Sequence, residues 1–164
     1  ISGAHINPAV SLGFFLQGQL STARFASYLS AQFLGAILAS LVVARMLPNE
    51  AFRTLTLPSV SIPFAIGIEV TITLVLVCVI LELSLARPWP RAAVALSVGT
   101  TVGLLCYVAG GATGASMNPA RSLGPAFAAA RVEELWLYLF APALGGLFAG
   151  LLWRAIRKPH VEKR

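Results

Sequence analysis

The sequence contains one twelve-residue segment twice. Residues 2–13 read SGAHINPAVSLG and residues 113–124 read TGASMNPARSLG. The copies are identical at eight of twelve positions and lie 111 residues apart. An isolated Asn-Pro-Ala tripeptide recurs by chance, but two copies in matching frames indicate an internal duplication. A fold for this chain must therefore place two equivalent units.

Each copy predicts the start of a short helix, because Asn is a preferred N-cap and Pro is preferred at the first helical position. A helix over residues 7–16 is roughly 15 Å long, about half the hydrocarbon thickness of a bilayer. Its free N–H groups would face the membrane interior, which requires burial in protein or a water-filled cavity. Two such half-helices that meet at the midplane would form a permeation site. Its residues are Asn7, Pro8, Ala9, Asn118, Pro119 and Ala120.

Four longer windows predict full membrane spans. The composition is 57% hydrophobic and 11% charged, without a single Asp. Such windows are not typical of a soluble domain, so the chain is predicted to be an all-α membrane protein. Gly110 and Gly111 are expected to begin the loop into the second motif, and the second half-helix to end near Arg131. The spans are expected at about residues 23–46, 62–83, 92–108 and 135–157.

The duplication extends beyond the motifs. Residues 28–35 (YLSAQFLG) match residues 138–145 (YLFAPALG) at five of eight positions. Two spans precede the second motif and one follows it, and a unit of three spans forces the two units into opposite orientations. By this symmetry the first unit lacks two leading spans, on the order of 50 to 60 residues. We therefore expect an N-terminally truncated single domain: the end of the first repeat at 1–46, a complete second repeat at 61–157 and a tail at 158–164.

The positive charges predict an orientation. A net charge of +6 could suggest nucleic acid, but the basic residues lie between and after the spans rather than along one face. If the tail is cytoplasmic, eight of them fall on that side and three on the other, which follows the positive-inside rule. We expect a multi-pass protein of the plasma or inner membrane, in contact with lipid and not with nucleic acid. The eight are Arg24, Arg87, Arg91, Arg154, Arg157, Lys158, Lys163 and Arg164, and the three are Arg45, Arg53 and Arg131.

No cofactor, metal or enzymatic site is expected. Cys78 and Cys106 both lie in predicted spans, which argues against a disulfide or a metal site. No Ser–His pair, metal-ligand cluster or paired carboxylates can be placed at membrane depth, which argues against an intramembrane enzyme. A secondary transporter and a non-conducting membrane protein stay open as alternatives. A transporter usually has coupling carboxylates near its site, and here the spans contain only Glu69 and Glu82.

These features resemble the aquaporin, or major intrinsic protein, family over nearly the whole chain. The paired motifs, Arg121 directly after the second motif and Glu69 in the span before it carry the resemblance. Residues 113–127 and 135–138 look most like the nodulin-26-like branch and its bacterial relatives. The resemblance implies six spans and two half-helices per subunit, of which four spans and both half-helices are present, and a homotetramer with one pore per subunit. The implied activity is passive flow of water or small neutral solutes, with protons and ions excluded.

The resemblance also implies roles for single residues. The side chains of Asn7 and Asn118 would donate hydrogen bonds to passing oxygen atoms. Arg121 would lie at the narrowest constriction. Glu69 and His5 would support the site by bonding the loop backbone behind the half-helices.

Two departures from the family pattern bear on the solute. Cys106 stands twelve residues before Asn118, where water-selective members usually carry His, and together with the small Ala115 it implies a wide constriction. Ser122 follows Arg121, where glycerol facilitators typically carry Asp. The combination predicts a pore for water, glycerol-like polyols and uncharged metalloid hydroxides.

Each of these residues also has a plainer interpretation. The two Asn residues could be ordinary N-caps, Arg121 could extend to the membrane interface, Glu69 could conduct and Cys106 could be inert core. Two glycine pairs with GxxxG spacing predict close helix packing rather than chemistry. They are Gly99 with Gly103 and Gly146 with Gly150.

Overall fold

The computed structural model describes residues 3–48, 52–86 and 89–157, and these ranges contain helices and no strand. Four helices are long and apolar enough to cross a membrane within the described ranges: α2, α4 with its continuation η2, α5 and α7. This confirms the predicted all-α membrane architecture. The elements are α1 (Pro8–Leu16), α2 (Thr22–Met46), η1 (Phe52–Thr54), α4 (Ile62–Leu81), η2 (Glu82–Ala86), α5 (Arg91–Thr113), α6 (Pro119–Ala128) and α7 (Leu135–Ile156).

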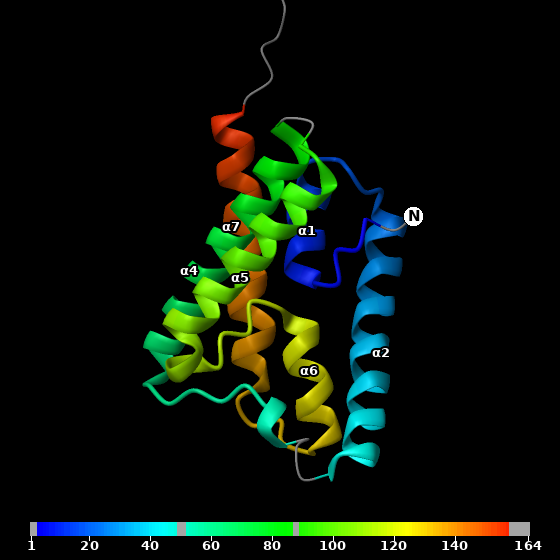
Figure 1. The fold of residues 1–164 in the computed structure, drawn as a ribbon, viewed down its shortest axis with the longest axis vertical. Helices are drawn as coiled ribbons and strands as arrows, with labels where there is room; N and C mark the ends of the chain where they lie inside the picture. Colours follow the sequence, from blue (N-terminus) through cyan, green and yellow to red (C-terminus); the bar gives the residue numbers. More distant parts are fainter. Residues whose placement is uncertain (1–2, 49–51, 87–88, 158–164) are drawn as a thin grey trace, which may run out of the picture.

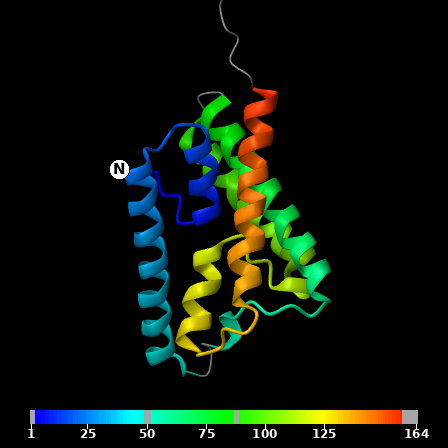
Figure 2. The same cartoon turned by 180° about the vertical axis from the view of Figure 1, so that it is seen from behind.

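The two short helices α1 and α6 are the predicted half-helices. They enter from opposite ends of the molecule, and their N-terminal ends face each other near its middle (Figure 1). Seen from behind, α7 runs past both of them (Figure 2). This arrangement confirms the inverted repeat. It brings the two Asn-Pro-Ala segments, which are 111 residues apart in the sequence, into contact.

Close backbone packing holds the half-helices in place. A Cβ at Gly146 of α7 would lie 2.5 Å from the carbonyl oxygen of Ala9, and one at Gly150 would lie 2.7 Å from a methyl of Leu16. A Cβ at Gly124 of α6 would likewise lie 2.5 Å from the carbonyl oxygen of Ala36 on α2. Helices approach this closely only where a side chain is missing at the contact.

The second predicted glycine pair behaves differently. A Cβ at Gly99 or Gly103 of α5 would meet no described atom within 4 Å. The interpretation of Gly146 and Gly150 as packing residues is confirmed, whereas Gly99 and Gly103 face an open side of the described chain.

Two predicted boundaries were wrong. Helix α5 does not stop before Gly110 and Gly111 but continues through both to Thr113, and Gly114 ends it with φ +77°. Glycine costs only about 1 kcal/mol inside a helix, so packing against α4 overrides it. Helix α6 ends at Ala128, before Arg131, because Ala130 adopts φ 51°. The predicted tail at 158–164 lies outside the described residues.

Candidate functional site

The two motif asparagines form a reciprocal pair at the centre of the molecule. The side-chain Nδ2 of Asn7 donates to the carbonyl oxygen of Met117 at 2.8 Å, and Nδ2 of Asn118 donates to the carbonyl oxygen of Ile6 at 2.9 Å. Each Oδ1 caps its own helix, at 2.9 Å from the N–H of Ala9 in the first motif and through two N–H groups in the second. An amide nitrogen has two protons, so each asparagine retains one N–H beyond this pairing.

The loops before the two motifs have the same unusual backbone. Three residues in each copy have positive φ, at positions 111 residues apart. A left-handed residue with a Cβ costs roughly 1 kcal/mol or more, so surrounding contacts must maintain the shape. This shape directs a carbonyl of each loop toward the opposite motif. The values are 72°, 50° and 51° at Gly3, Ala4 and Ile6, and 77°, 42° and 53° at Gly114, Ala115 and Met117.

Glu69 maintains the second loop. Its carboxylate is fully buried and accepts hydrogen bonds from the hydroxyl of Thr113 at 2.7 Å, the N–H of Ser116 at 2.9 Å and the N–H of Met117 at 3.0 Å. Tyr138 of α7 donates to the carbonyl of Thr113 at 2.8 Å and closes the loop from the other side. A buried carboxylate is stable only with such donors. Here the donors are the N–H groups that the left-handed turns direct inward.

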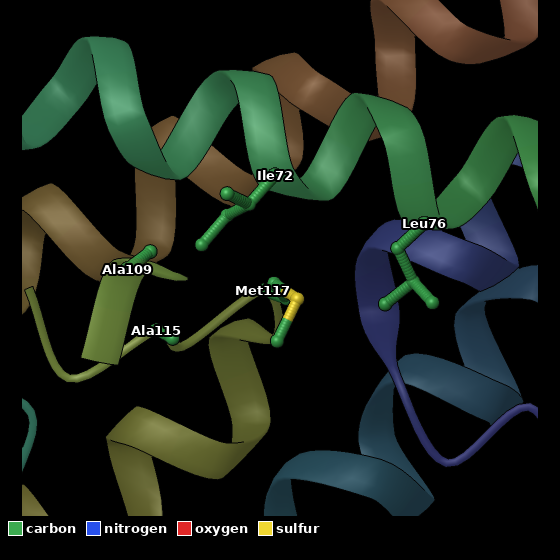
Figure 3. Close-up of a cluster of buried hydrophobic side chains, with 5 residues drawn as sticks. All are labelled: Ile72, Leu76, Ala109, Ala115 and Met117. Carbon is green, nitrogen blue, oxygen red and sulfur yellow. The ribbon is translucent and has the colours of Figure 1, made fainter. Parts of the chain in front are cut away.

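A hydrophobic cluster covers the other face of the same loop. Figure 3 shows Ile72 of α4 directed toward Ala109, with Ala115 and Met117 in the same cluster. Ala115 is only 3% exposed, so its methyl group lies in this cluster and not on an open surface. The cluster fixes Met117, whose carbonyl receives the amide of Asn7.

Arg121 projects from the first turn of α6. Its Nη1 donates to the carbonyl oxygen of Thr54 at 3.0 Å, in the connection that follows α2. Cys106 lies on α5, and its side chain is exposed. Ala115, the third residue predicted at the constriction, is buried in the hydrophobic cluster.

His5 is held differently from Glu69. We expected it to bond the loop backbone and expected no Ser–His pair at membrane depth, but its Nδ1 lies 3.1 Å from the hydroxyl of Ser11 on α1. Its ring stacks on Phe14 at 4.4 Å and meets Tyr28 edge-on at 5.2 Å. Because Ser11 also accepts a hydrogen bond from Gln32 of α2 at 2.9 Å, these contacts tie the first motif to its neighbouring helix.

Two cavities meet at the first motif. One of about 610 Å³ lies between α2 and both motifs and includes Asn118 and Arg121. The other, of about 580 Å³, lies between α1, η2 and the start of α5, and includes Ser84 and Arg91. Ala4 and His5 line both. The strained loop therefore separates two open spaces, and Asn118 lines the first of them.

Sequence reasoning missed several residues of this site. Ser11 and Ser122 occupy equivalent positions in the duplicated segment, and this identity could have indicated a shared structural role. Thr54 and Thr56 have no such signal, because they reach the motifs from a segment outside the repeat. Gln32 lies in the repeated span, but the equivalent residue of the other copy is Pro142. Among the described residues, no group of three or more His, Cys, Asp or Glu side chains could hold a metal ion.

Comparison with known proteins agrees with this geometry. The chain is 37% identical over 159 residues to "Putative aquaporin NIP4-1" of Arabidopsis thaliana, covering 96% of this chain and 56% of that protein. It is 36% identical over 168 residues to "Lens fiber major intrinsic protein" of Oryctolagus cuniculus, covering 99% and 64%. The chain thus spans somewhat more than half the length of these relatives, which are named as aquaporins or intrinsic proteins and not as enzymes.

A solved structure shares the fold. The aquaglyceroporin from Plasmodium falciparum superposes with a TM-score of 0.83 at 25% identity, over 95% of this chain and 74% of that one. The family model described as "Major intrinsic protein" matches residues 1–153. The reciprocal asparagines, the opposed half-helices and these matches lead to one conclusion: the chain belongs to the major intrinsic protein family and is a multi-pass membrane protein.

Proposed function

We propose that the protein is a passive membrane channel for water and small neutral solutes, including glycerol-like polyols and uncharged metalloid hydroxides. The observation that carries the proposal is the reciprocal pairing of Asn7 and Asn118 beside the cavity that Asn118 and Arg121 line. The pairing fixes two amide groups and leaves each with one N–H for a passing oxygen atom. Water or a hydroxyl group can accept from these donors in turn without any group changing its protonation state.

The same geometry supports exclusion of cations and protons. The N-terminal ends of α1 and α6 carry positive partial charge and point toward each other at this place. Arg121 adds a full positive charge beside them. Together they make the centre of the pore unfavourable for any cation. Water that accepts from both asparagines is also oriented against a continuous proton-conducting chain.

The proposed selectivity constriction is formed by Arg121 and Cys106, with Ala115 behind them. The thiol of Cys106 occupies little space, so the constriction admits solutes larger than water. The proposal places the protein in the cell membrane, the plasma or inner membrane, with a cytoplasmic C-terminus. It assembles as a homotetramer with one pore in each subunit, and molar mass in detergent from light scattering tests the assembly.

Stopped-flow light scattering on proteoliposomes that contain the full-length protein tests the function. A sucrose jump reports water efflux as shrinkage, and a glycerol jump reports solute entry as re-swelling. We expect both to be fast. Fast shrinkage without re-swelling would reject the wide constriction, and flux equal to that of empty vesicles would reject the channel.

Replacing Arg121 by Ala should raise glycerol permeability and proton leak, because it removes both the bulk and the charge at the constriction. The measurement is the glycerol-jump experiment together with a pH-sensitive dye inside the vesicles. Arg131→Ala is the matched control, since the Arg131 side chain is half-exposed and pairs with Glu133 at 3.7 Å on the surface. Unchanged glycerol and proton flux in Arg121→Ala would contradict its place in the pore.

We also propose that further helices cover α2. Gly35 of α2 corresponds to Gly145 of α7 in the duplicated segment. A Cβ at Gly145 would lie 2.6 Å from the carbonyl of Val70 on α4, whereas one at Gly35 would meet no described atom within 4 Å. The internal symmetry thus leaves room on α2 for a span equivalent to α4, as two leading spans would provide.

The Gly35→Leu variant of the full-length protein tests this packing. If a span packs on α2 as α4 packs on α7, the leucine overfills the contact. The free energy of unfolding should then fall by about 2 kcal/mol, and the thermal midpoint in detergent should fall with it. A midpoint equal to that of the wild type would show that this face of α2 is uncovered.

A further inference from the structure

Three buried hydroxyl groups connect the segment before α4 to the second motif. Oγ1 of Thr56 donates to Oγ of Ser122 at 2.7 Å, and Oγ of Ser122 lies 2.6 Å from Oγ of Ser116. Ser116 donates to the carbonyl oxygen of Asn118 at 3.0 Å. The exposed fractions of these three hydroxyl-bearing residues are 6%, 1% and 4%. We call them the hydroxyl chain.

The direction of the hydroxyl chain follows from counting protons. A hydroxyl group has one proton to donate. Because Ser116 gives its proton to Asn118, the bond between the two serines must be donated by Ser122. Ser122 must then accept from Thr56, as its geometry indicates. Each of the three hydroxyl groups therefore donates its proton to the next group toward Asn118. Loss of the Thr56 hydroxyl then removes only the hydrogen bond between Thr56 and Ser122.

The hydroxyl chain ends two residues from the contact that holds the guanidinium. Thr56 follows Thr54, whose carbonyl accepts from Arg121 at 3.0 Å. Two residues span at most about 7 Å, so fixing Thr56 restricts this carbonyl strongly. Thr56 also packs closely against Gly114, because a Cβ added at Gly114 would lie 3.2 Å from the Cα of Thr56. The segment cannot shift at Thr56 while both contacts persist.

The first motif has the corresponding serine contacts with a helix and provides an internal comparison. Its equivalents of Ser116, Ser122 and Arg121 are His5, Ser11 and Val10. There the serine is bonded to Gln32, a residue of helix α2, and the arginine position is apolar. In the second copy, which carries the guanidinium, the motif serine is thus connected to an irregular segment, whereas in the first copy it is connected to a helix.

We propose that the hydroxyl chain is a positioning device for Arg121 that sets the selectivity of the channel. Thr56 and Ser122 hold the carbonyl of Thr54 in place, and this carbonyl holds the guanidinium against the pore wall. The inference rests on the proposed channel function. Thr56 touches no solute in this account and acts only through Arg121.

The decisive comparison is Thr56→Ala against Thr56→Ser. Both variants lose the methyl group that packs on Gly114, and only Thr56→Ser keeps the hydroxyl. Without the hydroxyl the guanidinium is no longer held to the wall and occupies part of the pore, which hinders glycerol more than water. We expect the ratio of glycerol to water permeability to fall about fivefold in Thr56→Ala, the factor of one net hydrogen bond, and to stay near the wild-type value in Thr56→Ser.

Thr71→Ala is the matched control. Thr71 lies on the exposed side of α4, and its hydroxyl donates to the carbonyl of Gly67 within its own helix at 2.7 Å. Its permeability ratio should equal that of the wild type. Equal ratios in Thr56→Ala and Thr56→Ser would overturn the proposal. A parallel fall of water and glycerol flux in Thr56→Ala, at unchanged ratio, would also overturn it, because that result indicates a structural role.

A second measurement does not depend on flux. In a double-mutant cycle of thermal unfolding in detergent, Thr56→Ala and Ser122→Ala should be coupled, because both remove the same bond. Additive effects would overturn the hydroxyl chain. If the two mutations are coupled but the wild-type protein conducts no water, the proposed channel function is rejected. The hydroxyl chain would then be a structural connection only.

Discussion

Replacing Glu69 by Gln should lower the free energy of unfolding by about 3 kcal/mol and reduce water permeability to the level of empty vesicles. The glutamine oxygen can still accept from Thr113 and Ser116, but its amide nitrogen then faces the N–H of Met117. Two donors would oppose each other in a site without exposed surface. The loop must move, and the Met117 carbonyl that holds Asn7 moves with it.

The measurement is thermal unfolding in detergent, together with stopped-flow shrinkage of vesicles. Glu82→Gln is the matched control, because its side chain is 45% exposed and pairs with Arg157 at the end of α7. An exposed ion pair contributes about 1 kcal/mol or less. Wild-type stability and flux in Glu69→Gln would show that a neutral acceptor suffices behind the second motif.

Replacing Gly146 by Ala should cost about 2 kcal/mol of stability, although only a methyl group is added. The new Cβ would lie 2.5 Å from the carbonyl oxygen of Ala9 and 3.0 Å from its carbonyl carbon. These are backbone atoms of the first half-helix, so no side-chain rotation relieves the overlap. Helices α1 and α7 must separate, which shifts Asn7 and lowers water permeability as well.

Gly103→Ala provides the control for this substitution. It also lies in the middle of a membrane helix, but a Cβ there would meet no described atom within 4 Å. Alanine favours helix by up to about 1 kcal/mol relative to glycine, so this variant should be as stable as the wild type or slightly more stable. Equal losses in the two variants would mean that the α1–α7 contact is not tight.

Both variants show how the site depends on its surroundings. The left-handed residues of the two loops are costly in isolation. They persist because Glu69 binds the N–H groups of one loop and because α7 and α2 press the half-helices into position. The amide groups at the centre are therefore fixed before any solute arrives, and this preorganisation makes two asparagines sufficient for the proposed conduction.

Most of the architecture was predictable from short-range chemistry. Charge-free windows predict spans because burying charge in lipid is costly, and Asn-Pro predicts a helix start because of the cap and the fixed φ of proline. The end of α5 was not predictable in this way. Gly110 and Gly111 have the composition of a loop, and the contacts of Ala109 and Thr113 with α4 keep the segment helical.

For the site, the duplicated segment predicts which residues meet. Two equivalent half-helices in opposite orientation must bring Asn7 and Asn118 together, whatever the remaining details are. The contacts that hold them arise from helix packing and were not predictable. The contact of His5 with Ser11, the burial of Ala115, the carbonyl of Thr54 and the hydroxyl chain all join segments that are distant or irregular in the sequence. A local pattern encodes a cap or a span, whereas the partner of a buried hydroxyl depends on how whole helices pack.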